Sequence, residues 1–209
     1  MTMSFNNVKL ESISEKGSYG IGLQIGQQLL DSQMDIKVEA VAKGIFDALN
    51  HNQPALDIND LMTSVQQLQQ QAAEAQQAQF KVIEEEGKAF LAENAKKDGV
   101  NITDSGLQYE IITEGKGTKP NATDKVRVHY IGTLPNGTVF DSSVARGQPA
   151  EFPVNGVIRG WVEALQMMPV GSKWKLAIPH ELAYGERGAG ASIPPFSPLV
   201  FEVELLDIL

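Results

Sequence analysis

The hydrophobic positions of the first fifty residues recur at helical spacing. Residues 14–34 read as one helix that Ser14 would cap, with an apolar face of Ile21, Ile25, Leu29 and Leu30. A second helix with a wide apolar face is expected from Asp35 to about Asn50. Two short helices cannot bury this much apolar surface between themselves. The pattern therefore predicts a partner, and a second copy of the same chain is the simplest one.

A long helix is expected from Ile58 to about Lys97, because this stretch has no proline and only one glycine, Gly87. Unbroken, it would measure roughly 60 Å at 1.5 Å per residue. Large apolar residues occur near both ends, but none lies between Gln69 and Gln79. This gap favours a solvent-exposed arm over a continuous coiled coil, and a disordered linker is the alternative. If the arm bends, Gly87 is the expected place.

After Gly99 the pattern changes to short β-type segments separated by turn residues such as Pro135-Asn136-Gly137 and Pro169-Val170-Gly171. The expected strands are 107–113, 124–134, 139–140, 150–154, 173–178 and 199–209. One short amphipathic helix, Gly160 to Met168, interrupts them. This arrangement is an α+β fold in which a twisted antiparallel sheet wraps one helix.

Composition supports a division of the chain into different architectures. Both tryptophans lie after residue 105, as does every proline except Pro54. The first hundred residues are instead rich in Gln, Ala, Glu and Lys. We therefore expect a helical dimerisation domain at 1–56, a long connecting helix at 57–98 and a β-rich domain at 99–209.

Charge and cysteine content narrow the classes of partner and cofactor. A formal net charge of −9 argues against nucleic acid or an anionic membrane as the main partner. The chain has no cysteine, which removes disulfides, thiolate nucleophiles and cysteine-bound zinc. Met1 to Leu10 has neither a basic segment nor an apolar core of the signal-peptide type, and no apolar run approaches ~18 residues. The expected location is the cytoplasm.

Conventional catalytic motifs are not found. His51, His129 and His180 lie far apart without metal-ligand spacing, so no metal is expected. The sequence has neither a G-x-S-x-G nucleophile elbow nor a G-x-x-x-x-G-K-[ST] phosphate loop. No cofactor is expected either. Any chemistry must work without a strong nucleophile.

The C-terminal half instead holds many aromatic residues: Tyr130, Phe140, Phe152, Trp161, Tyr184 and Phe201. In a domain of this size such residues most often form only the core. The order of short motifs around them argues for a specific site. These motifs are Val128-His129-Tyr130-Ile131-Gly132, Gly137-Thr138-Val139-Phe140-Asp141-Ser142-Ser143, Val157-Ile158-Arg159-Gly160-Trp161, Leu182-Ala183-Tyr184-Gly185, Ile193-Pro194-Pro195 and Leu199-Val200-Phe201-Glu202-Val203-Glu204-Leu205.

In this order the motifs resemble the FKBP-type peptidyl-prolyl cis-trans isomerases over residues 106 to 209. The N-terminal part is similar, in architecture more than in motif, to the dimerisation region of the macrophage infectivity potentiator subgroup. The resemblance implies an antiparallel half-barrel around a short helix, with an apolar pocket whose floor is Trp161. The implied pocket walls are Tyr130, Phe140, Phe152, Val157, Ile158, Tyr184 and Phe201.

The resemblance also implies polar roles for Asp141, the Ile158 N–H and the Tyr184 hydroxyl, with Arg146 paired to Asp141. Catalytic roles thus fall to Tyr130, Phe140, Asp141, Ile158, Trp161, Tyr184 and Phe201, and substrate binding to Arg146, Phe152, Val157 and Ile193. Ala150 stands where the family often has phenylalanine, and a small-residue loop, 188–192, precedes Ile193. Because of both departures, the turnover of a substrate is expected to depend differently on the residue that precedes its proline.

The resulting expectation is a homodimeric prolyl isomerase that acts on unfolded or partly folded proline-containing chains and binds macrolides such as rapamycin or tacrolimus. The alternatives are a chaperone or adaptor that holds proline segments without turnover, and a structural dimer whose aromatic residues are only core.

Overall fold

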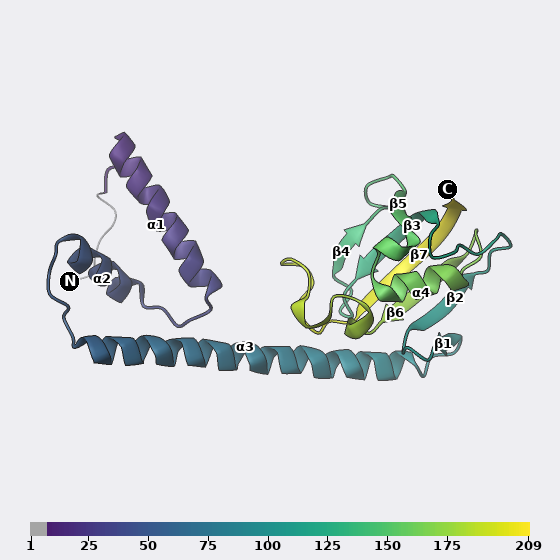
Figure 1. The fold of residues 1–209 in the computed structure, drawn as a ribbon, viewed down its shortest axis with the longest axis horizontal. Coiled ribbons are helices and arrows are strands. Elements are labelled where there is room, and N and C mark those ends of the chain that lie inside the picture. The colour runs from purple at the N-terminus through teal and green to yellow at the C-terminus, as the bar shows by residue number, and fades with distance from the viewer. Residues whose placement is uncertain (1–7) are drawn as a thin grey trace. The chain divides into compact units, whose positions relative to one another are not determined.

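The computed structural model describes residues 8–209 and divides the chain into two compact units, Met1–Ala78 and Gln79–Leu209. The boundary falls inside the long helix α3 (Ile58–Asn94), which contributes residues to both units. The first unit is otherwise helical, and the second holds all the strands (Figure 1). The expected α+β fold, with N-terminal helices followed by an antiparallel sheet, is confirmed.

The first unit contains helices α1 (Ile13–Asp31) and α2 (Val38–Leu49). The cap of α1 is Ser12 rather than the expected Ser14: the Glu15 N–H donates to Ser12 Oγ, and the Glu15 carboxylate accepts from the Ser12 N–H at 2.8 Å. This reciprocal capping box uses the acceptor three residues before Glu15, which Ser14 cannot be. Helix α2 starts three residues later than expected, at Val38.

Neither α1 nor α2 buries a residue, and together they line an open apolar groove of about 940 Å³. The groove is lined mainly by aliphatic residues, among them Leu23, Ile25, Leu29, Val41 and Ile45. A Cβ added at Gly22 or Gly26 would meet nothing within 4 Å. The expected apolar face of α1 is therefore present and uncovered in the single chain.

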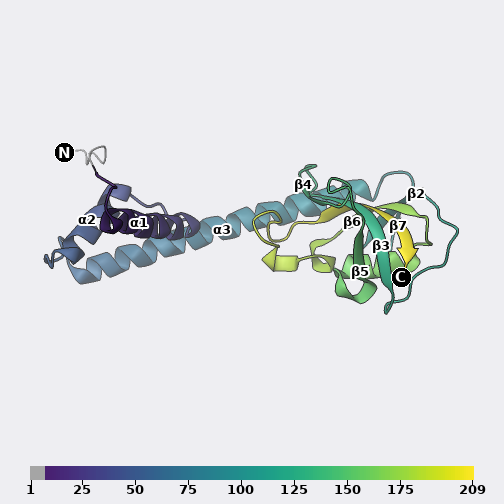
Figure 2. The same cartoon turned by 90° about the horizontal axis from the view of Figure 1, so that it is seen from above.

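Helix α3 is continuous from Ile58 to Asn94 (Figure 2), and Asp57 precedes it, with its Oδ1 accepting from the Asn59 N–H at 2.8 Å. It ends three residues before the expected Lys97, in a turn in which Gly99 has a φ of +83°. Gly87, the expected place for any bend, lies within this single helix. Gly87 is buried, because the chain before the last strand packs directly against it.

The second unit is built on a seven-stranded antiparallel sheet with the order β1-β2-β6-β7-β3-β4, and β5 pairs with the other half of β3. The strands are β1 (Val100–Ile102), β2 (Gln108–Thr113), β3 (Lys125–Thr133), β4 (Val139–Ser142), β5 (Ala150–Pro153), β6 (Lys173–Ile178) and β7 (Leu199–Ile208). All strands except β1 were expected. The three residues of β1 are too few for their alternation to be recognised.

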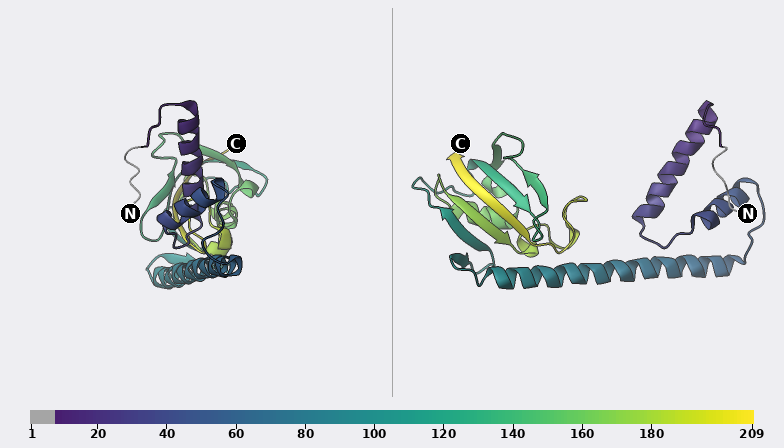
Figure 3. Two further views of the ribbon diagram at one scale, coloured as in Figure 1. Left: turned by 90° about the vertical axis from the view of Figure 1, so that its left-hand side faces the viewer. Right: turned by 180° about the vertical axis from the view of Figure 1, so that it is seen from behind.

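Helix α4 (Arg159–Met167) covers one face of this sheet, and Figure 3, right, shows the sheet from the opposite side, with β7 across it. Its buried residues Trp161, Ala164 and Leu165 join the inward-facing residues of β3, β6 and β7 in one core. Gly160 allows this close packing, since a Cβ there would lie 2.5 Å from Ile178 Cγ2 on β6. Within residues 8–209, no helix combines the length and the apolar character needed to span a membrane.

Candidate active site

Four aromatic side chains from β3, β5, β7 and α4 surround one another at one end of the core. The Trp161 ring lies edge-on to three of them, with ring centroids 5.2 Å from Tyr130, 5.9 Å from Phe152 and 5.2 Å from Phe201. Phe140 of β4 joins through Phe201, at 5.5 Å and 85° between the ring planes. Such edge-to-face pairs are the geometry that aromatic quadrupoles favour.

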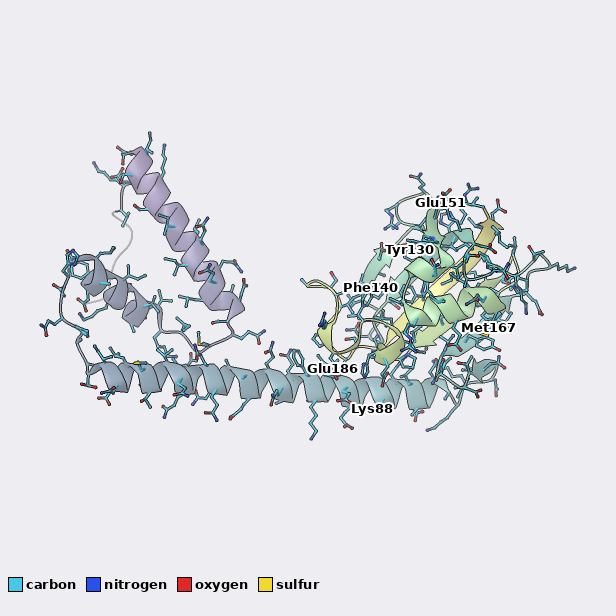
Figure 4. The ribbon with its side chains drawn as sticks, in the orientation of Figure 1. Lys88, Tyr130, Phe140, Glu151, Met167 and Glu186 are labelled. Carbon is cyan, nitrogen blue, oxygen red and sulfur yellow. The ribbon has the colours of Figure 1, made fainter. Side chains whose placement is uncertain are left out.

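Gly132 on β3 makes this packing possible. A Cβ at Gly132 would lie 2.6 Å from Phe140 Cε2 and 2.8 Å from Phe201 Cε1, so any side chain there would push both rings away. Figure 4 marks Tyr130 and Phe140, which come from the neighbouring strands β3 and β4.

The five rings differ in solvent exposure: three are buried and two are partly accessible. Trp161, Tyr130 and Phe201 are 4%, 6% and 5% exposed, whereas Phe140 and Phe152 are only partly buried. Trp161 Nε1 is buried and has no hydrogen-bond partner within residues 8–209.

A polar network lies beside the aromatic cluster. The Tyr130 hydroxyl donates to one Asp141 carboxylate oxygen, and the Arg146 guanidinium pairs with the other. Arg146 Nη2 also donates to the Tyr130 hydroxyl oxygen at 3.1 Å, and its Cζ lies 5.8 Å from the Tyr130 ring centroid. The pairing of Arg146 with Asp141 that the resemblance implied is present.

These contacts shift the pKa values of both acids in opposite directions. Burial opposes ionisation of Asp141, but the hydrogen bonds from Tyr130 and Arg146 outweigh it, so the pKa of Asp141 is lowered. Burial and the hydrogen bond to Asp141 raise the pKa of Tyr130. At neutral pH the network is thus a carboxylate held by a neutral phenol and a guanidinium.

Val157 and Ile158 lie immediately before α4 and pack against the core while remaining partly exposed. The Ile158 carbonyl accepts from the Trp161 and Val162 N–H groups at 2.9 and 3.1 Å, which fixes the peptide that begins the helix. The Ile158 N–H has no protein acceptor within residues 8–209 and is free to donate to a ligand. The neighbouring Arg159 is exposed, as expected.

Tyr184 and Ile193 belong to the chain between β6 and β7 rather than to the sheet. Ile193 is 6% exposed and is part of the core, whereas Tyr184 is 42% exposed. Tyr184 forms no ring pair with the aromatic cluster, and its hydroxyl has no partner in the described part of the chain. The structure therefore joins the other predicted residues to the core or to the Tyr130 network, whereas Tyr184 is joined to neither.

Ser143, the last residue of the motif that contains Asp141, has a structural role that its sequence position does not reveal. Its buried Oγ accepts from the Tyr130 N–H at 2.8 Å and lies 3.0 Å from His129 Nδ1. The Ser143 N–H also donates to the Tyr130 carbonyl at 3.0 Å. These bonds fix the backbone of Tyr130. They could not be predicted from the sequence, because they depend on how β3 lies beside the chain after β4.

Within residues 8–209, no group of three or more His, Cys, Asp and Glu residues is arranged to hold a metal ion. The chemistry that the site offers is apolar contact, a few hydrogen-bond donors and a fixed carboxylate.

Two family models match the chain. Residues 116–206 match the FKBP-type peptidyl-prolyl cis-trans isomerase model, and residues 14–111 match the domain amino terminal to FKBP-type peptidyl-prolyl isomerase. Among curated proteins, the chain is 58% identical to the FKBP-type 22 kDa peptidyl-prolyl cis-trans isomerase of Escherichia coli K12, over 95% of this chain and 97% of that protein. It is 40% identical to the Outer membrane protein MIP of Legionella longbeachae, over 95% of this chain and 87% of that protein.

Solved structures agree with these matches. The crystal structure of FkpA from Escherichia coli superposes with a TM-score of 0.71 at 34% identity, covering 95% of this chain and 97% of that chain. A peptidyl-prolyl cis-trans isomerase from Pseudomonas syringae superposes with a TM-score of 0.58 at 44% identity, covering 61% of this chain and 94% of that chain. The chain therefore belongs to the FKBP-type peptidyl-prolyl cis-trans isomerases that carry an amino-terminal domain.

Proposed function

We propose that this isomerase turns over X-Pro bonds at the aromatic cluster, with Trp161 beneath the proline ring and with Tyr130, Phe140, Phe152, Val157 and Phe201 around it. The observation that carries this assignment is the Tyr130–Asp141–Arg146 network directly beside the cluster. An ionised carboxylate held next to apolar rings gives a proline-containing segment both a contact surface and a fixed electrostatic neighbour.

The physical basis is differential binding of the twisted amide. Rotation of an X-Pro bond faces a barrier of about 18–20 kcal/mol, because the planar amide loses resonance when it twists. The twisted amide has less charge separation than the planar one, so an apolar surrounding favours it relative to water. Each ~1.4 kcal/mol of such differential stabilisation raises the rate about tenfold.

Two donors complete the proposed site. The Ile158 N–H and the Tyr184 hydroxyl hold the carbonyl groups that flank the proline, while Ile193 and Arg146 contact the chain on either side. No proton leaves the substrate in this reaction, so it needs no general base.

A peptide isomerisation assay with Phe140→Ala and Asp141→Ala tests the assignment. Each variant is expected to lower kcat/KM at least about tenfold, which corresponds to ~1.4 kcal/mol of lost transition-state stabilisation. Val139→Ala, at a neighbouring exposed position of β4, is the matched control. Wild-type turnover in both site variants would show that catalysis lies elsewhere.

We also propose that two chains associate through α1 and α2 and that the dimer binds unfolded or partly folded protein clients. The uncovered apolar groove between these helices supports this proposal. Two sites in one assembly raise the effective concentration for a second contact with the same client. The Phe140→Ala variant tests whether client binding and isomerisation are separate activities. If they are, the variant suppresses client aggregation as strongly as the wild type although it has lost turnover.

Macrolides such as rapamycin and tacrolimus are the proposed inhibitors of this site, and quenching of Trp161 fluorescence measures their binding.

The cytoplasmic location expected from the sequence stays a prediction, which cell fractionation against a periplasmic marker enzyme would test.

A further inference from the structure

The part of α3 that belongs to the second unit has one protected face. From residue 79 onwards its residues with reduced exposure recur at spacings of three and four: Phe80, Ile83, Glu84, Gly87, Phe90, Leu91 and Asn94. This is the period of one helix face packed against a neighbour. The neighbour is the catalytic unit itself, since both belong to the same compact body.

The chain that precedes β7 packs against this face at Gly87. A Cβ at Gly87 would lie 2.7 Å from Pro198 Cδ, 3.1 Å from Pro198 Cγ and 3.6 Å from the Phe196 carbonyl oxygen. Pro198 is buried, so its ring has little room to retreat. Gly87 therefore serves close packing, which explains why a residue with poor helix propensity lies inside a continuous helix.

Aromatic rings extend this contact along α3. The ring centroid of Phe196 lies 5.9 Å from that of Phe80 and 5.4 Å from that of His180. Phe196 has a φ of +61°, a conformation that bulky residues rarely adopt unless their surroundings hold them in it.

The end of α3 is fixed to the sheet by a buried amide. Gln108 of β2 is 6% exposed, donates through Nε2 to the Leu91 carbonyl at 2.9 Å and accepts from Asn94 Nδ2 at 2.9 Å. This pair ties the last turn of the helix to β2. These hydrogen bonds fix the position of α3 along its axis relative to the sheet.

The same loop carries two proposed site residues. The Phe196 N–H donates to the Gly185 carbonyl at 2.9 Å, which ties the helix-facing segment to the residue after Tyr184. Ile193 is held by paired hydrogen bonds with Ala189, at 2.9 and 3.2 Å. Gly188 allows this turn, because a Cβ there would lie 2.3 Å from the Ile193 carbonyl oxygen.

We propose that Phe80 and Gly87 of α3 are positioning residues for isomerisation, which set the placement of Tyr184 and Ile193 through Phe196 and Pro198. The catalytic unit then begins in the middle of α3 rather than after it. The inference builds on the proposed roles of Tyr184 and Ile193, and its test separates the two.

The test is Gly87→Ala in the full-length chain, assayed for peptide isomerisation and followed by amide NMR of the loop. Alanine has a higher helix propensity than glycine, so the substitution does not weaken α3 itself. Any effect comes from the contact of the new Cβ with the loop. We expect kcat/KM to fall at least about threefold, with shifted Tyr184 and Ile193 amide signals, and the overpacked contact to lower the thermal stability as well. Gly87→Ala combined with Pro198→Ala, which removes the ring atoms that the new Cβ would meet, is expected to recover most of the activity.

Phe80→Ala and Phe80→Leu form a second, independent pair. Phe80→Ala should lower kcat/KM, and the bulkier leucine should restore it at least partly. Lys88→Ala, on the exposed face of α3, is the matched control and should have wild-type turnover. Wild-type kcat/KM in both Gly87→Ala and Phe80→Ala would overturn the proposal, as would a loss that Pro198→Ala does not reduce.

Tyr184→Phe is measured beside these variants. Unchanged turnover in Tyr184→Phe would refute the proposed role of its hydroxyl, whereas the Gly87 and Phe80 pairs still decide whether α3 acts on the loop.

Discussion

Asp141 shows how a single residue can be both partly exposed and firmly held. Its side chain is 42% exposed, yet both carboxylate oxygens have partners, Tyr130 on one side and Arg146 on the other. Its lowered pKa follows from these two hydrogen bonds, which outweigh its partial burial. The ion pair by itself contributes little to stability at such exposure, so its role is to fix the position of the charge.

The lowered pKa predicts a definite pH dependence of stability. The unfolded chain binds the proton of Asp141 more readily than the folded one, so the contribution of Asp141 is complete above about pH 4, the ordinary range of an aspartate. It is lost as the pH falls through the lower pKa of the folded protein. Urea unfolding of the wild type and Asp141→Asn at pH 7, 4 and 3 should show a stability difference that shrinks as the pH falls. A difference independent of pH would contradict this.

At this scale the sequence predicted most of the candidate site, because the site residues lie in short motifs that the strands keep intact. Tyr130 and Asp141, for example, are brought together by the local pairing of β3 with β4. Ser143 was missed because its role depends on a contact with the backbone of Tyr130, which no side-chain pattern encodes. Ser12 was missed because Ser14 offers a hydroxyl of the same kind only two residues away.

Among the elements, α3 differs most between sequence and structure. Its extent could be read from composition and periodicity to within three residues. The function of Gly87 could not, since a helix glycine can mark a bend or a close contact and only the position of Pro198 distinguishes them. The strands from β2 to β7 were predictable because their alternation and turns are local signals.

The packing of α3 predicts where the catalytic unit can be cut. A fragment of residues 79–209 should be more stable than one of residues 99–209 by at least about 2 kcal/mol, because the shorter fragment exposes the surface that Phe80, Phe90 and Leu91 cover. Denaturant unfolding of both fragments measures the difference. Equal stability would mean that α3 contributes nothing to the fold of this unit.

In the whole molecule, the two units bury their apolar residues to very different degrees. The second unit has a continuous core around Trp161, whereas α1 and α2 leave large side chains such as Tyr19, Leu23 and Phe46 more than half exposed. Such surface is unusual for a helical unit that is stable alone, which is why we propose association through it. The sequence indicated this association by the same surplus of apolar residues.

The proposed association predicts a separation of two activities. Ile25→Asp places a charge in the apolar groove and should yield a monomer with unchanged peptide turnover but at least about tenfold slower catalysis on a refolding protein. Gln24→Asp, the same new residue on the exposed face of α1, is the control. Light scattering and a proline-limited refolding assay measure the two effects. A dimeric Ile25→Asp protein, or one with full activity on protein substrates, would argue against the model.

Both tryptophans of the chain lie in the second unit, and both are 4% exposed with an indole N–H that has no protein partner there. Trp161 stands among the rings of the candidate site, while Trp174 stacks on Tyr109 at 4.6 Å. Intrinsic tryptophan emission is therefore an optical signal of the catalytic unit alone. Melting of α1 and α2 would change the far-ultraviolet circular dichroism while leaving that emission unaltered, so the two spectra together resolve the order in which the parts of the chain unfold.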